Sequence, residues 1–258
     1  MTHYEIFREC FPRLELTEKL FDTLAGEGNC QSFDIPEGFA LTKGNQLRLI
    51  CVLPDKRRCG AGTRLFSAAE QHIRSLGFDR METGGTDSEL LIGVPEECAG
   101  FFEKQGCTLG EAVAEMNAGE LNLPDPVSGA DFGVFSGSPE ELRAAVAAVE
   151  PDWVPYFAEG EFFCATVGGK IASFCILGRD ETCILSRGDS RMGSIGCVGT
   201  VPEFRRRGIG LEMVAEATRL LLADGCDDIF IHYTAVYRWY SRLGYRTRLM
   251  LRLGGKDL

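Results

Sequence analysis

The chain has 258 residues, of which 27 are Lys or Arg and 38 are Asp or Glu, so its formal net charge is −11. Its fractions of hydrophobic (45%) and charged (25%) residues are those of a globular protein, which excludes wholesale disorder, and its length predicts one large or two modest domains. No apolar stretch reaches the roughly 18 residues of a membrane span, and charges interrupt the first residues, so we expect a cytoplasmic protein without a signal peptide or a membrane partner. The acidic excess disfavours a nucleic-acid partner.

The eleven cysteines are scattered singly, with no C-x-x-C pair and only three histidines in the chain. This pattern predicts neither a zinc site nor a disulfide framework. Most cysteines lie in apolar runs such as residues 49–52 and 162–165, where a free thiol acts as a small buried hydrophobe in a reducing compartment. A catalytic cysteine is the alternative.

The first half of the chain predicts strands alternating with helices. Turn residues Gly44 and Asn45 separate a hairpin whose second strand covers residues 47–53. Apolar residues at three- and four-residue spacing then predict a helix over 63–75, which Gly77 ends. A short strand over 81–83 and an aromatic helix over 99–106 complete this half.

The second half predicts the same order of elements. A Pro-, Gly- and Ser-containing connector at residues 123–129 marks the boundary, so we expect domains at 1–125 and 126–258. The predicted elements are a hairpin over 162–177, a strand over 194–201, a helix over 211–223, a strand over 229–233 and a helix over 237–244.

A repeat connects the two halves. Residues 53–62 read LPDKRRCGAG and residues 201–210 read VPEFRRRGIG, 148 positions later, and the same shift carries Gly77 onto Gly225. Each copy is a strand, a basic glycine loop and a helix.

The glycine loops have the chemistry of a phosphate site. Glycines at a strand-to-helix turn let the backbone approach an anion, the first helix amides point at it, and the arginines add positive charge. Neither loop contains the Walker motif or the dinucleotide fingerprint G-x-G-x-x-G. The repeated Arg-x-x-Gly-x-Gly pattern therefore predicts a different pyrophosphate ligand.

The Pro-containing strand end, the Arg-x-x-Gly-x-Gly loop, the helix and the aromatic helix that ends in Leu-Gly-Tyr together resemble the acyl-CoA signature of the GNAT superfamily of N-acetyltransferases. The similarity covers about residues 39–107 and 162–248. It implies an α/β fold (α+β mixed sheet) made of two tandem GNAT-like acyl-CoA N-acyltransferase domains, an architecture similar to that of mycothiol synthase. It also implies a sheet that splays between two strands, with acetyl-CoA as co-substrate and no metal.

The resemblance assigns cofactor contacts in both halves. In the second half it implies main-chain contacts from Thr200 and Val201 to the pantetheine and acetyl groups, and a pyrophosphate cradle. The cradle residues are Arg205, Arg206, Arg207, Gly208, Ile209, Gly210 and Leu211. The counterparts in the first half are Val52, Arg57, Arg58, Cys59, Gly60, Ala61, Gly62 and Thr63.

Acetyl transfer to an amine needs a neutral nitrogen, a stabilised oxyanion and a proton for the departing thiolate. The family resemblance gives the last role to a Tyr four residues before the Gly of the closing motif, which is Tyr240 here. The matching residue of the first half is Phe102, which has no proton to give, so we expect the second half to be catalytic and the first half to be non-catalytic. Packing of an aromatic helix is the alternative role for Tyr240.

His232, at the end of a β-prone strand, is the candidate base, directly or through water. A packing role is its alternative, and Glu159, Glu161 or a water relay are other candidates. Three aromatic residues upstream of the hairpin, Trp153, Tyr156 and Phe157, either enclose the acceptor or fill the interface between the halves.

The sequence therefore predicts an acetyl-CoA-dependent N-acetyltransferase that acts by direct attack in a ternary complex. The acceptor is a small-molecule or protein amine of undefined identity, and the oligomeric state stays open because a tandem pair can mimic a dimer. The alternatives are a noncatalytic acyl-CoA-binding sensor or interaction protein, and an enzyme that uses its first half.

Overall fold

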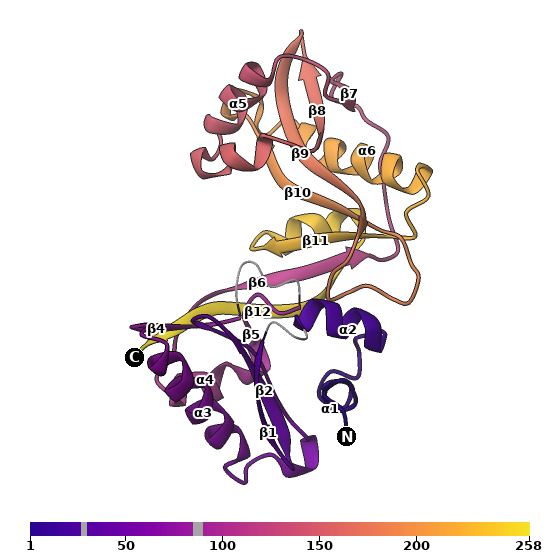
Figure 1. Cartoon of the computed structure of the whole chain (residues 1–258). Helices are drawn as coiled ribbons and strands as arrows, with labels where there is room; N and C mark the ends of the chain where they lie inside the picture. Colours follow the sequence, from indigo (N-terminus) through magenta and orange to yellow (C-terminus); the bar gives the residue numbers. More distant parts are fainter. Residues whose placement is uncertain (27–29, 85–89) are drawn as a thin grey trace. The chain divides into compact units, whose positions relative to one another are not determined.

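The computed structural model describes residues 1–26, 30–84 and 90–258 (Figure 1). The chain forms two compact units. Unit 1 consists of Met1–Val113, Thr182–Asp189 and Leu249–Leu258, and unit 2 consists of Ala114–Glu181 and Ser190–Arg248.

These units differ from the expected division at residues 125 and 126 because each takes a strand from the other half of the sequence. Strand β6 (Thr108–Ala118) pairs with β11 (Asp228–Thr234) through residues such as Met116. Strand β12 (Tyr245–Asp257), at the end of the chain, pairs with β4 (Arg80–Thr83). A single boundary in the sequence therefore cannot separate the two units.

Unit 1 is a mixed sheet with helices on both sides. The strand order is β1-β2-β3-β4-β12-β6, with β5 also paired to β12, and β3 and β4 are parallel. Helices α3 and α4 lie on one side of β1 to β3, and α1 lies on the other (Figure 1). The elements not yet named are α1 (His3–Cys10), α2 (Glu18–Ala25), β1 (Gln31–Ile35), β2 (Gly38–Lys43), β3 (Gln46–Val52), η1 (Pro54–Lys56), α3 (Ala61–Ser75), β5 (Val94–Pro95), η2 (Glu96–Cys98) and α4 (Ala99–Lys104).

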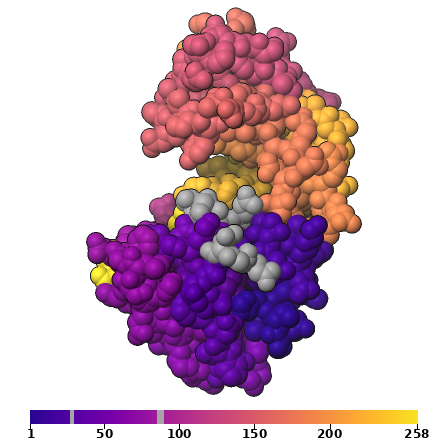
Figure 2. All heavy atoms as spheres, viewed as in Figure 1, coloured from indigo at the N-terminus to yellow at the C-terminus, as the bar shows by residue number. Residues whose placement is uncertain are grey.

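Unit 2 repeats this plan with the order β6-β11-β10-β9-β8-β7. Strands β10 and β11 are parallel, and the other strand pairs of this unit with a defined register are antiparallel. Atoms of α5 and of the 3-10 helix η3 lie at the surface and are pink in the space-filling view (Figure 2). Helix α6 packs on β8, β9 and β10. The elements are β7 (Asp131–Val134), α5 (Pro139–Ala147), η3 (Pro151–Phe157), β8 (Glu161–Val167), β9 (Lys170–Glu181), β10 (Met192–Thr200), η4 (Pro202–Phe204), α6 (Ile209–Ala223), α7 (Tyr237–Tyr240) and η5 (Ser241–Leu243).

The predicted α/β fold is confirmed, and most predicted elements lie within two residues of the observed ones. Both long helices begin two residues earlier than expected, directly after Gly60 and Gly208, because these glycines are themselves the N-caps. The closing helix of unit 2 changes to a 3-10 helix after Tyr240, and Gly244 (φ +90°) ends it.

Each unit has its own hydrophobic core. In unit 1 the buried face of α3, including Leu65, Phe66 and Ile73, packs with Met81 of β4 and Phe102 of α4. In unit 2 a cluster under α5 contains Leu142, Val146, Phe157, Cys164 and Phe174. Burial of these side chains is the main source of stability of each unit.

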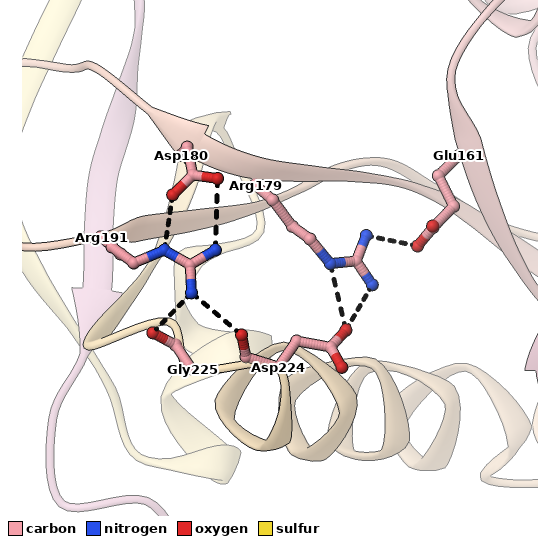
Figure 3. A network of polar contacts seen from close by, with 6 residues as sticks. All are labelled: Glu161, Arg179, Asp180, Arg191, Asp224 and Gly225. Carbon is pink, nitrogen blue, oxygen red and sulfur yellow. Dashed lines mark hydrogen bonds and ion pairs between the residues drawn. The ribbon is translucent and has the colours of Figure 1, made fainter.

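Two arginines of β9 and the loop before β10 fix the end of α6. Arg179 bridges Glu161 of β8 and Asp224, the C-cap of α6 (Figure 3). Arg191 pairs with Asp180 and donates to the carbonyl oxygens of Asp224 and Gly225, as Figure 3 shows. Arg191 thus binds the carbonyls of the C-cap and of the residue after it, and both cations oppose the negative end of the helix.

Candidate functional site

The two glycine loops have the same backbone conformation. Arg58 and Arg206 both have a φ of +64°, and the N-caps Gly60 and Gly208 have φ values of +80° and +83°. Each loop follows a three-residue 3-10 helix and opens a 15-residue helix. The repeat found in the sequence therefore extends to the main-chain dihedral angles.

The start of each long helix lacks a side-chain cap. The first amides of an α-helix have no partner inside the helix, and neither Gly60 nor Gly208 provides a side-chain hydrogen bond to them. In unit 2 the first main-chain donors to the carbonyl of Gly208 are the amides of Leu211 and Glu212. The amides before them, together with the positive end of the helix dipole, favour an anion at the loop.

The arginines of the second loop shape its backbone. Arg205 donates from Nε to the carbonyl oxygen of Thr200 at 2.9 Å. Arg207 donates to the carbonyl of Glu203, and its guanidinium lies 5.4 Å from the ring centroid of Phe204. Arg206 is exposed at the rim. In unit 1, Arg57 makes the bond equivalent to that of Arg205, to the carbonyl of Val52 at 3.1 Å.

The other predicted loop residues have packing roles as well. A Cβ at Gly210 would lie 2.6 Å from Oγ1 of Thr200, and one at Gly62 would lie 3.3 Å from the ring of Phe101. The helix starts therefore pack tightly against neighbouring elements. Ala61 and Ile209 are buried, Leu211 is half-buried, Cys59 is exposed, and Thr63 accepts a hydrogen bond from Gln105.

Strands β10 and β11 separate beyond a short parallel ladder. They pair only from Met192 to Ser194, although β10 continues to Thr200. This is the splay that the family resemblance implies. The amide of Val201 donates to the carbonyl of Ala172, and its carbonyl accepts from the amide of Phe204, so both main-chain groups of Val201 are engaged within the chain. Because the main-chain groups of successive strand residues point to alternate edges, those of Thr200 point away from β9, toward the splay.

A β-bulge interrupts β10 at the splay. Gly196 pairs with Ile176 and Gly199 with Phe174, so Cys197 and the residue after it lie opposite one residue of β9. Cys197 has a φ of +47°. A bulge leaves its extra residue out of the ladder and redirects the backbone. This geometry offers a main-chain donor to a ligand in the splay.

Unit 1 lacks a bulge at the equivalent place. Its β3 pairs regularly with β2 from Leu49 to Val52, and the register shift occurs one residue earlier, at Arg48. The two units therefore share their loops but differ in the strand that precedes the loop.

Tyr240 lies buried in unit 2, with 5% of its surface exposed. Its ring packs edge-on against Trp239 and Tyr245. Burial raises the pKa of the Tyr240 hydroxyl well above 10, and the nearby thiols of Cys175 and Cys197 act in the same direction. The Tyr240 hydroxyl therefore stays protonated at neutral pH, as a proton donor must. Phe102 of unit 1 packs edge-on against Phe66 and Phe101.

His232 forms a pair that the sequence did not reveal. Its Nδ1 lies 2.9 Å from Oε2 of Glu115 on β6, and the His side chain is 45% exposed while that of Glu115 is 1% exposed. Burial raises the pKa of the Glu115 carboxyl, and His232 opposes that rise. The signal for Glu115 was a single charged residue inside the apolar run of residues 113–116.

The remaining predicted residues are either packed in the core, paired with an arginine or exposed. Phe157 is buried in the core under α5 and stacks on Phe162, so it is not available to enclose an acceptor. Trp153 packs on the same core, whereas Tyr156 is 62% exposed. Glu161 is paired with Arg179, and Glu159 is exposed.

An open hollow of about 410 Å³ lies at the start of α7. It is lined by Ala235, Val236, Tyr237, Arg238 and Trp239. In the described part of the chain, no group of three His, Cys, Asp or Glu residues is arranged to hold a metal ion. None of the described helices is long and apolar enough to cross a membrane.

Residues 135–245 match the model of the acetyltransferase (GNAT) family. This segment contains the glycine loop, the bulge, Tyr240 and His232. No match was found among curated proteins.

Solved structures resemble the whole chain. One contains a GCN5-related glucosamine N-acetyltransferase region of a fungal multi-domain GH3 β-N-acetylglucosaminidase, with a TM-score of 0.71 and 24% identity over 97% of this chain. The chain covers 36% of that protein. A GCN5-related N-acetyltransferase from Sphaerobacter thermophilus has a TM-score of 0.59 and 18% identity, covering 86% of this chain and 76% of its own.

A tandem GNAT protein from the clavulanic acid biosynthesis pathway has a TM-score of 0.58 and 12% identity, covering 98% of this chain and 93% of its own. At these identities the likeness concerns the fold. The chain thus has the two-domain GNAT arrangement, while the resemblance to mycothiol synthase stays a prediction.

Proposed function

We propose that this protein, whose residues 135–245 match the model of the acetyltransferase (GNAT) family, is an acetyl-CoA-dependent N-acetyltransferase with its catalytic site in unit 2. The observation that carries the proposal is the coincidence, inside the matched segment, of the splay, the bulge at Cys197 and a buried, protonated Tyr240. The eleven free thiols favour a reducing compartment such as the cytoplasm.

The residues present suit acetyl-CoA. The uncapped start of α6 and Arg206 would hold its pyrophosphate, and the main-chain amide of Thr200 would contact the pantetheine, because the carbonyl of Thr200 already accepts from Arg205. A main-chain amide released by the bulge would donate to the thioester carbonyl oxygen, where negative charge develops.

The chemical step is direct. The amine nitrogen forms a bond to the acetyl carbonyl carbon, the carbon–sulfur bond breaks, and the thiolate of CoA takes a proton from the Tyr240 hydroxyl. His232 accepts the proton that the amine loses. Both residues are in unit 2.

The first acceptor to test is glucosamine, because the fungal structure that aligns over 97% of this chain is described as a glucosamine N-acetyltransferase region. Other primary amines and a peptide with a free N-terminus complete the panel. The acetylation assay measures CoA thiol release.

A single calorimetric series assigns the cofactor site. Acetyl-CoA is titrated into the wild-type protein, Gly60→Glu and Gly208→Glu, each variant checked for folding by circular dichroism. Loss of a binding event in Gly208→Glu supports a site in unit 2. Loss in Gly60→Glu alone contradicts it, and no binding to any form rejects the acetyltransferase proposal.

Unit 1 would bind acyl-CoA without turnover. It keeps the loop conformation of unit 2 but has Phe102 in place of the Tyr and no bulge at the matching position. A second binding event that Gly60→Glu removes, without any loss of thiol release, is the expected sign of this role.

A further inference from the structure

Glu115 is a buried carboxylate that is hydrogen-bonded to His232, and the main chain of Tyr233 adds a hydrogen bond to the same group. Oε2 lies 2.9 Å from Nδ1 of His232, whereas Oε1 is buried without a hydrogen-bond partner among the residues that the structure describes. Burying a carboxylate with one of its oxygens unpaired is unfavourable for folding. Such an arrangement persists when it serves a site rather than stability.

The backbone around this pair is specialised. The β6–β11 ladder pairs Ile231 with Met116 and then shifts register before Thr234. Tyr233, directly after His232, has a φ of +52°, an uncommon conformation for an aromatic residue. The shift and the turn of the strand set His232 against Glu115 while nearly half of the His side chain stays exposed.

We propose that Glu115 is the positioning residue of the base His232: it holds the proton on Nδ1 and leaves Nε2 as the atom that takes the proton of the acceptor amine. This inference rests on the proposed function. An ionised carboxylate only accepts hydrogen bonds, so the nitrogen facing it must carry hydrogen. The imidazolium formed when Nε2 takes the proton is then stabilised by the adjacent negative charge.

The pair joins parts that are distant in the sequence. Glu115 precedes the connector at residues 123–129, and His232 follows it by about a hundred residues, yet both belong to unit 2 because of the strand exchange. The segment that matches the family model begins after Glu115. The residue that contacts the base His232 therefore lies outside the segment that matches the family model.

The same ladder provides a structural control. Asn117, two residues beyond Glu115 on β6, donates to Oδ2 of Asp228 at 2.6 Å and is also buried. It makes a polar contact across the same two strands without touching His232. Asn117→Ala therefore tests the effect of a lost buried contact on the ladder.

The test combines spectroscopy with kinetics on the full chain. Long-range ¹⁵N–¹H spectra of histidine-labelled protein at about pH 8.5, where ordinary histidine is neutral, report which nitrogen carries the proton, and His232→Gln assigns the signal among the three histidines. The variants are Glu115→Gln, which keeps an acceptor but removes the charge, Glu115→Met, which removes both, and Asn117→Ala.

We expect wild type and Glu115→Gln to carry the proton on Nδ1, and Glu115→Met to move it to Nε2. We also expect kcat for amine acetylation to fall about tenfold in Glu115→Gln and about a hundredfold or more in Glu115→Met, with KM for acetyl-CoA unchanged. Asn117→Ala should lower Tm but leave the tautomer and kcat unchanged.

An unchanged tautomer in Glu115→Met, or a kcat within twofold of wild type, overturns the proposal. If the wild-type protein acetylates no amine, the proposed function fails, and the tautomer measurement still decides whether Glu115 orients His232.

Discussion

Arg205 donates from Nε to the carbonyl oxygen of Thr200, and this bond folds the glycine loop back onto the end of β10. Arg57 repeats it on Val52 in unit 1. An arginine placed before the glycines thus fixes the turn, so its contribution to ligand binding comes from the loop conformation as well as from charge.

Loss of this bond should weaken cofactor binding. We expect Arg205→Ala to raise the Kd for acetyl-CoA at least tenfold, about 1.4 kcal/mol, because a charge-assisted bond that orders the loop is removed. Isothermal titration measures it. Arg57→Ala is the matched control, and an equal loss in that variant would show that unit 1 binds the cofactor that is being measured.

Replacement of the proton donor should affect the chemical step. We expect Tyr240→Phe to lower kcat by about 10²- to 10⁴-fold with little change in KM for acetyl-CoA, since the phenyl ring keeps the packing on Trp239 but has no proton for the thiolate. Thiol release at saturating acetyl-CoA is the measurement. A kcat close to wild type would leave Tyr240 a packing residue.

Phe102→Tyr makes the reciprocal change in unit 1. We expect no gain in kcat, because unit 1 also lacks the bulge at the matching position of β3. A measurable gain would contradict the view that the strand as well as the tyrosine distinguishes the units.

The thiol of Cys10 should be reactive near neutral pH. Hydrogen bonding to Cys51 and the charge of Arg57 outweigh burial and lower its pKa to about 7, whereas burial raises the pKa of Cys107 to about 11. The Cys10 thiolate of the folded protein therefore forms as the pH rises through about 7. Because the pKa of this thiol is about 9 in the unfolded chain, the free energy of unfolding increases between about pH 7 and pH 9. Peptide mass spectrometry after iodoacetamide labelling should show a midpoint near pH 7 for Cys10 and little labelling of Cys107. A midpoint near 9 for Cys10 would contradict the assignment.

The ion-pair network of unit 2 should contribute to stability in a salt-dependent way. We expect Arg179→Ala to lower the free energy of unfolding by on the order of 1 kcal/mol at low salt, because it leaves Glu161 and Asp224 without their shared partner (Figure 3). Denaturant unfolding at low and high salt measures the effect. A loss that is independent of salt would point to packing of the arginine stem instead.

The repeat, the glycine loops and the main helices could be predicted because their signals are local. The Pro, Arg and Gly offsets recur in residues 53–62 and 201–210, and the structure gives both copies the same left-handed residues at Arg58, Gly60, Arg206 and Gly208. Helix periodicity and turn glycines likewise depend only on neighbouring residues. The family resemblance assigns the proton-donor role to Tyr240 by its position four residues before Gly244, and that role stays a prediction.

The strand exchange, the bulge and the Glu115–His232 pair were decided by the tertiary structure. A connector between 123 and 129 indicates where a chain bends, but only the pairing of β6 with β11 and of β12 with β4 shows which strand completes which sheet. Glu115 and His232 are 117 residues apart and share no local pattern. The chemistry of the loops follows from neighbouring residues, so the sequence alone determined it. Strand register and cross-strand contacts depend on residues far apart in the chain, so only the packing of β6 against β11 placed the Glu115 carboxylate beside His232.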